Sequence, residues 1–69
     1  MEIKWENDFK ISVGIRDGEA TLSANREGLR SLANILLALE NETPGSHIHL
    51  DRYNSLEDDS AELVIELTE

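Results

Sequence analysis

The sequence predicts an α+β domain in which one amphipathic helix packs on one face of a mostly antiparallel sheet. The sheet is expected to have four or five strands, in the chain order β-β-β-α-β-β. Three observations support this fold: two alternating runs joined by Asp17-Gly18, one run with helical spacing, and two alternating segments near the C-terminus. At 69 residues with no linker-like stretch, residues 1–69 are expected to form a single domain.

A β-hairpin is the clearest local feature. Apolar side chains at positions 9, 11, 13 and 15 alternate with polar or small ones, which is the period of a half-buried strand. The Asp17-Gly18 pair that follows favours a two-residue type I′ turn, because both turn positions need a positive φ. Such a turn fixes the register, pairing Arg16 with Glu19, Ile15 with Ala20, Val13 with Leu22 and Ile11 with Ala24. Apolar residues then face apolar residues, so turn chemistry and pattern agree.

A single helix is expected from about Arg26 to about Asn41. Leucine and alanine side chains at positions 29, 32, 33, 36 and 39 recur at helical spacing. Asn25 stands where a residue with a side-chain oxygen can cap the first turn, and Pro44-Gly45 prevents the helix from continuing.

Three shorter strands complete the expected sheet. Ser46–Asp51 and Ala61–Leu67 alternate in polarity, and a short strand around Ile3–Trp5 precedes the first hairpin. The core is expected to contain nine side chains: Ile11, Val13, Leu29, Leu32, Leu36, Ile48, Leu50, Leu63 and Ile65.

The composition excludes several classes of protein. The chain has no cysteine, which excludes disulfide scaffolds and cysteine-ligated metal sites. No apolar run approaches the ~18 residues that span a bilayer, and the N-terminus lacks a signal-peptide pattern, so a soluble cytoplasmic protein is expected. The formal charge of −9 disfavours nucleic acid and anionic membranes as partners.

The acidic charge gathers in the C-terminal part of the chain. Residues 40–69 have nine acidic side chains and one basic one, which is a net charge of −8 out of −9. Such a surface either only keeps a small protein soluble or attracts a basic protein and speeds its association. An aromatic residue and a leucine among the carboxylates, Tyr53 and Leu56, favour the second interpretation. The expected partner-binding residues are Asp51, Tyr53, Glu57, Asp58, Asp59 and Glu62.

No constellation of catalytic residues is recognisable, and no cofactor is expected. His47, His49 and Asp51 alternate along one strand and are weak candidates for a metal site. A divalent ion needs further ligands, and the simpler interpretation places both imidazoles on the open face of the sheet. There they would pair with Glu62 or Glu66 across the hairpin.

Four segments are similar in sequence to a known family: EGLRSLAN at 27–34, GSHIHLD at 45–51, NSLE at 54–57 and SAELVI at 60–65. Together they resemble the immunity protein 32 family of bacterial polymorphic toxin systems, over roughly residues 20–67. The resemblance implies a small non-enzymatic α+β protein that neutralises a cognate toxin by direct binding. Its partner would be a toxin domain, and many such toxins are cationic nucleases.

Two other functions stay open at this point. A homodimeric structural or adaptor domain would use the open sheet face or a sheet edge, and a metal-binding protein would use His47, His49 and Asp51. The chain is expected to be a monomer or a homodimer, and sedimentation and zinc titration would separate these alternatives.

Overall fold

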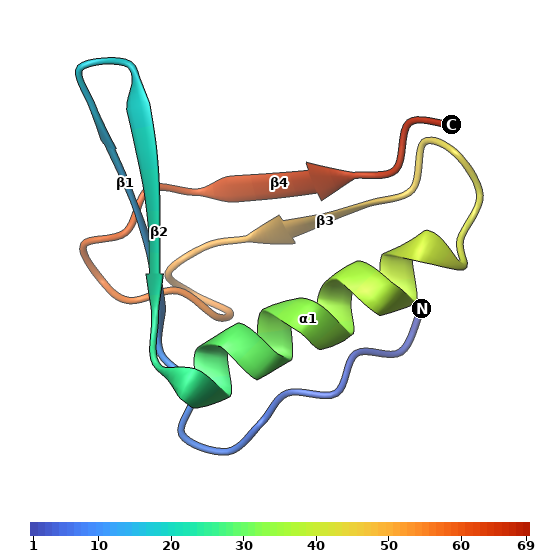
Figure 1. Cartoon of the computed structure of the whole chain (residues 1–69), viewed down its shortest axis with the longest axis horizontal. Coiled ribbons are helices and arrows are strands. Elements are labelled where there is room, and N and C mark those ends of the chain that lie inside the picture. Colours follow the sequence, from blue (N-terminus) through green and yellow to red (C-terminus); the bar gives the residue numbers. More distant parts are fainter.

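A computed structural model describes all of residues 1–69. The chain has an α+β fold with the element order β1 (Ile11–Arg16), β2 (Glu19–Ala24), α1 (Arg26–Glu40), β3 (His47–Leu50) and β4 (Leu63–Glu66). The β1–β2 hairpin stands across one end of the molecule, while β3, β4 and α1 run beside one another (Figure 1). α1 lacks the length and apolar character needed to cross a lipid bilayer.

The predicted first hairpin is confirmed in every pair. β1 and β2 are antiparallel, and Arg16, Ile15, Val13 and Ile11 lie opposite Glu19, Ala20, Leu22 and Ala24. The turn residues Asp17 and Gly18 have φ angles of 52° and 78°, the positive values that a two-residue turn requires.

The expected single sheet of four or five strands is not confirmed, since the strands form two separate two-stranded sheets, β1–β2 and β3–β4. The irregular segment 57–61 occupies the place beside β1 that another strand would take. The Glu57 and Ala61 N–H groups donate to the carbonyls of Ile11 and Val13 at 2.9 and 2.8 Å. The Val13 N–H donates to the hydroxyl of Ser60 at 2.7 Å, so a side chain replaces the main-chain acceptor of a regular ladder.

The two C-terminal strands are shorter than the ranges expected from the sequence. β3 covers His47–Leu50 within the expected Ser46–Asp51, and β4 covers Leu63–Glu66 within Ala61–Leu67. Asp51 already begins the following turn, and Ala61 is held by β1, so neither residue is free to extend its strand.

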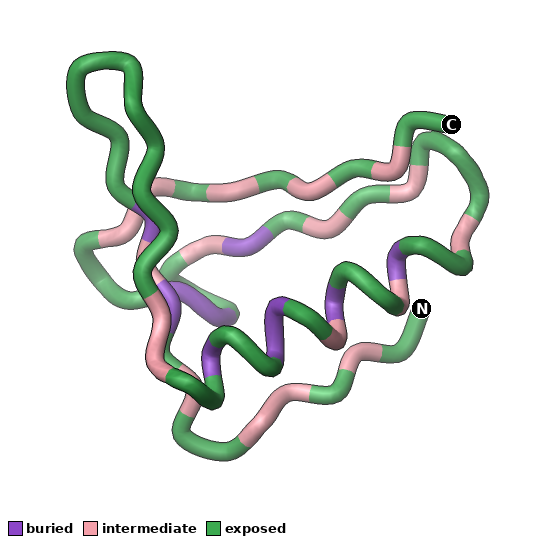
Figure 2. Tube along the Cα trace, viewed as in Figure 1, coloured by how far each residue is buried: buried purple, intermediate pink, exposed green.

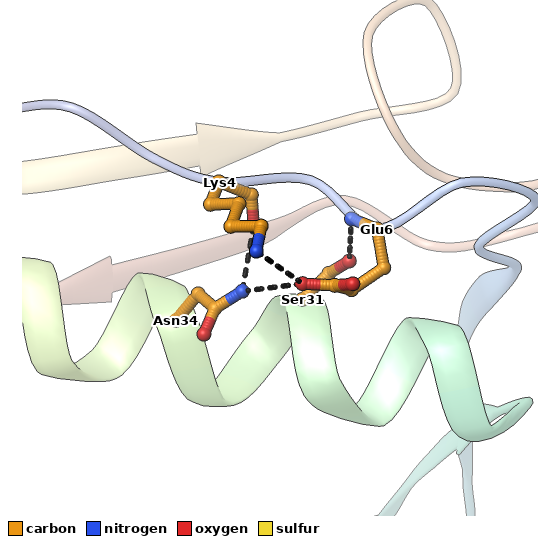
Figure 3. Close-up of polar contacts among 4 residues, drawn as sticks. All are labelled: Lys4, Glu6, Ser31 and Asn34. Carbon is orange, nitrogen blue, oxygen red and sulfur yellow. Dashed lines mark hydrogen bonds and ion pairs between the residues drawn. The ribbon is translucent and has the colours of Figure 1, made fainter.

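The expected strand at Ile3–Trp5 is absent, because side chains of α1 bind this part of the backbone (Figure 3). The Ser31 hydroxyl accepts from the Glu6 N–H at 2.8 Å, and the Asn34 amide donates to the Lys4 carbonyl at 2.8 Å. Asn34 also donates to the Glu6 carboxylate at 3.2 Å. The N-terminal segment therefore lies along the helix instead of joining a sheet.

The core lies where the base of the first hairpin, α1 and the end of β3 meet (Figure 2). Its central cluster is Ile11, Leu32, Ile35, Leu50 and Leu56. Four of the nine expected core residues are buried (Ile11, Val13, Leu32 and Leu50), and Ile48, Leu63 and Ile65 are partly buried. The prediction that Leu29 and Leu36 are buried is wrong. Each is 54% exposed, because the inward face of α1 consists of Ser31, Leu32, Ile35 and Leu39.

Asn25 caps α1, as predicted, and also ties the base of the hairpin together. Its side-chain oxygen accepts from the N–H groups of Gly28 at 2.7 Å and Lys10 at 2.9 Å. Its amide donates to the Asp8 carbonyl at 2.9 Å.

We expect Asn25→Ala to lower the free energy of unfolding by about 1–2 kcal/mol, because an N-cap and two further hydrogen bonds are lost together. Urea denaturation monitored by circular dichroism measures this change. Asn25→Asp is the control: it keeps the capping oxygen but loses the donor to the Asp8 carbonyl, so it should recover only part of the loss. Equal destabilisation by both substitutions would show that the cap is not the stabilising element.

Candidate functional site: the acidic loop

The loop between β3 and β4, residues 51–62, carries all six of the expected partner-binding residues. Five of them are exposed: Tyr53, Glu57, Asp58, Asp59 and Glu62. Asp51 is only partly exposed, and its carboxylate is used inside the loop. The expected site is therefore accessible as a surface, with one of its members serving a structural role.

Asp51 and Asn54 hold the first half of the loop in a fixed turn. One carboxylate oxygen of Asp51 accepts from the N–H groups of Tyr53 at 2.8 Å and Asn54 at 3.1 Å. The side-chain oxygen of Asn54 accepts from the Asp51 N–H at 3.0 Å, and its amide donates to the His49 carbonyl at 3.1 Å. Short polar side chains of this kind replace main-chain partners in turns, which fixes the position of Tyr53.

The second half of the loop is held in place by contacts with the core and with β1. Leu56 is 5% exposed and belongs to the central cluster. The sequence interpretation that grouped Leu56 with Tyr53 as an interface residue is therefore wrong. The hydrogen bonds from Glu57 and Ala61 to β1 hold the residues on either side of Asp58 and Asp59. These two carboxylates are thus displayed at the tip of an anchored segment.

Tyr53 is the most exposed of the large hydrophobic side chains, at 84%. It lies beside Arg52, whose guanidinium sits 5.1 Å from the centre of the tyrosine ring and donates to its hydroxyl at 3.1 Å. A hollow of about 340 Å³ opens at this point, and its lining is Asp51, Arg52, Tyr53, Ser60, Ala61 and Glu62. Arg52 and Ser60 are not among the site residues expected from the sequence, although Arg52 is the lone base among the last thirty residues.

The carboxylates of the loop have no basic partner. The one ion pair of the chain joins Lys4 to Glu6 at 4.0 Å, within the N-terminal segment. Asp58, Asp59 and Glu62 therefore present their charge to solvent without neutralisation. Unpaired surface charge of one sign produces a field that attracts oppositely charged molecules.

The two histidines lie on the exposed side of β3 but do not form the expected pairs. His47 is opposite Glu66 in the register, yet neither imidazole is within ion-pair distance of a carboxylate. The rings instead meet edge to face, with centres 5.0 Å apart, and His47 Nδ1 lies 3.1 Å from the Gly45 carbonyl. No group of three or more histidine, aspartate or glutamate side chains is arranged to hold a metal ion, so His47, His49 and Asp51 are not brought together as ligands.

A second, larger hollow of about 770 Å³ lies on the outer side of α1. Its lining includes the apolar residues Leu29, Ala33 and Leu37 together with Arg26 and Arg30. The sequence interpretation placed Leu29 in the core, so this surface was missed. The signal that could have found it is the excess of apolar residues on α1, which exceeds what one buried stripe accommodates.

The comparisons with known proteins give one result. The family model described as Immunity protein 32 matches residues 19–68, which include β2, the helix, the acidic loop and the β3–β4 hairpin. Neither the curated proteins nor the solved structures gave a match. The family match covers more than half of the chain and agrees with the resemblance noted in the sequence. The chain therefore belongs to the Immunity protein 32 family.

Proposed function

We propose that this protein neutralises a cognate bacterial toxin by binding it directly, and that the acidic loop forms the contact surface. Membership of an immunity protein family supports a protein partner of the toxin class and a role that is not typically enzymatic. The observation that carries the choice of surface is Tyr53, 84% exposed at the edge of a hollow and flanked by unpaired carboxylates.

The arrangement of the loop suits two separate tasks in binding. Asp58 and Asp59 lie outside the hollow and Glu62 belongs to its lining; all three carboxylates lack a basic partner, so they attract a basic surface from a distance. Tyr53 offers a rigid aromatic surface, and aromatic side chains of this kind contribute much of the binding energy at interfaces. Because Asp51 and Asn54 already fix the turn, little conformational entropy is lost when a partner orders it.

The two tasks predict different kinetic effects. Asp58→Lys/Asp59→Lys should lower the association rate constant for the toxin domain of the same locus, and the rate for the natural protein should fall as salt rises. Tyr53→Ala should mainly speed dissociation, weakening binding by about 2 kcal/mol or more. Surface plasmon resonance over a range of salt concentrations measures both rate constants.

A matched control separates the effect of charge in the acidic loop from the effect of the net charge of the protein. Glu2→Lys/Glu19→Lys changes the net charge by the same amount as the loop variant, at exposed positions outside the loop. This control should bind nearly as the natural protein does. Equal association rates for both double variants, together with unchanged dissociation of Tyr53→Ala, would exclude the acidic loop as the interface.

A further inference from the structure

The outer edge of β2 has hydrogen-bonding groups with no partner in the chain. In an antiparallel pair, successive residues direct their N–H and C=O groups alternately toward the partner strand and away from it. Ile11 and Val13 of β1 direct theirs away from β2, since both bond to the segment 57–61. Their register partners, Ala24 and Leu22, together with Ala20, therefore direct their groups away from β1. No main-chain or side-chain hydrogen bond reaches the N–H or C=O groups of these three residues.

The β2 edge also lacks the features that usually protect an exposed strand. Natural edge strands are blocked by lysine, proline, bulges or a covering loop. The sequence of β2 is EATLSA, its six residues pair with β1 without a bulge, and five of the six are exposed. Leu22 and Ile15 are 48% and 68% exposed on the same face of the hairpin. Figure 1 shows this hairpin extending beyond the rest of the molecule.

We propose that two copies of this chain associate through antiparallel pairing of their β2 strands about a twofold axis at Leu22. In this register Leu22 faces Leu22 of the second copy. Ala20 of each copy faces Ala24 of the other. All the unpaired groups of Ala20, Leu22 and Ala24 are then used, and the two hairpins become one four-stranded sheet. An isolated two-stranded hairpin is marginal in water, so the added strands also stabilise the exposed end.

Charge favours a second copy as the occupant of this edge. Residues 10–24 contain two basic and two acidic side chains and are neutral as a segment, although the chain carries −9. In the proposed register, Glu19 faces the uncharged Asn25, so no like charges are opposed. A cationic partner would gain no attraction here.

The acidic loops remain far apart in this dimer. Segment 57–61 lies beside β1, on the side of the hairpin away from β2. The order across the dimer is therefore segment 57–61, β1 and β2 of one copy, followed by β2, β1 and segment 57–61 of the second copy. At about 4.8 Å per strand spacing, the two segments are separated by about 24 Å. This exceeds the ~8 Å Debye length at physiological ionic strength, so repulsion between the loops is screened. Both loops stay free on the outside of the dimer.

Sedimentation of the full chain over micromolar to millimolar concentrations tests the proposal. The average mass should rise toward that of two chains, and Leu22→Lys should raise the dissociation constant at least about tenfold, because two lysines then face each other. Leu22→Pro should act in the same direction by removing an N–H that has no partner within the chain. Leu36→Lys, at a similarly exposed leucine on α1, should leave the dissociation constant unchanged.

Hydrogen exchange of the natural protein supplies a readout that does not depend on any variant. The amides of Ala20, Leu22 and Ala24 should exchange more slowly as concentration rises, while exposed loop amides should not change. A single-chain mass at every concentration would overturn the proposal. So would a dimer that responds equally to Leu22→Lys and Leu36→Lys, or a dimer in which the three amides exchange at a constant rate.

Discussion

Ile35→Ala is expected to lower the free energy of unfolding by about 2–5 kcal/mol. Ile35 is fully buried and belongs to the central cluster, together with residues from β1, β3 and the acidic loop. Its truncation removes apolar contacts and leaves a cavity that four separate segments border. Because a domain of this size has a total stability of only about 3–10 kcal/mol, this single substitution should remove a large share of it.

The neighbouring residue supplies the control for this prediction. Leu36→Ala removes as many carbon atoms from α1, but Leu36 is 54% exposed and should change stability by no more than about 0.5 kcal/mol. Urea denaturation followed by the fluorescence of Trp5, which packs at the edge of the core, gives both midpoints. Equal midpoint shifts, or a larger shift for Leu36→Ala, would contradict the orientation of the helix.

The first hairpin could be predicted from the sequence because two independent signals agree on one register. Asp17-Gly18 dictates a two-residue turn, and the alternation of apolar residues requires the same pairs. A shift by one residue would expose Ile11 and Val13, so no other register satisfies both signals. The limits of α1 were predictable for a similar reason, because Asn25 and Pro44-Gly45 are local signals.

The orientation of α1 about its axis could not be predicted, because its apolar residues surround more than one face. Leucines at positions 29, 36 and 37 compete with those at 32 and 39 for the interior. The outcome depends on the N-terminal segment, which binds Ser31 and Asn34 and so selects the face that turns inward. That contact joins residues 25 or more positions apart, and no local pattern reports it.

In the acidic loop, too, the features set by local sequence could be predicted and those set by distant contacts could not. Its exposure followed from its composition, and five of the six expected residues are on the surface. The burial of Leu56 and the hydrogen bonds to β1 depend on a strand more than forty residues earlier in the chain. Those distant contacts also prevent the two hairpins from merging into one sheet.

Gly28→Ala is expected to destabilise the protein by about 1–3 kcal/mol, although alanine is the better helix former by about 1 kcal/mol. Gly28 lies in the first turn of α1, directly against the base of the hairpin. A Cβ atom there would overlap the main-chain carbonyl oxygen of Lys10 and lie 3.0 Å from both the Ala24 Cβ and the Asn25 side-chain oxygen. The Lys10 carbonyl cannot move freely, because it accepts a hydrogen bond from the Asn25 N–H at 3.2 Å.

Gly14→Ala is the matched control, since Gly14 is exposed on β1 and a methyl group added there would have no heavy atom within 4 Å. It should leave stability unchanged or raise it slightly, because alanine restricts the unfolded chain. Thermal unfolding of the two variants therefore separates steric contact from helix propensity. If propensity decided the outcome, Gly28→Ala would be the more stable of the two, and the close approach of α1 to Lys10 would be wrong. If contact decides it, Gly28→Ala melts at the lower temperature, and glycine is required where the helix begins against the hairpin.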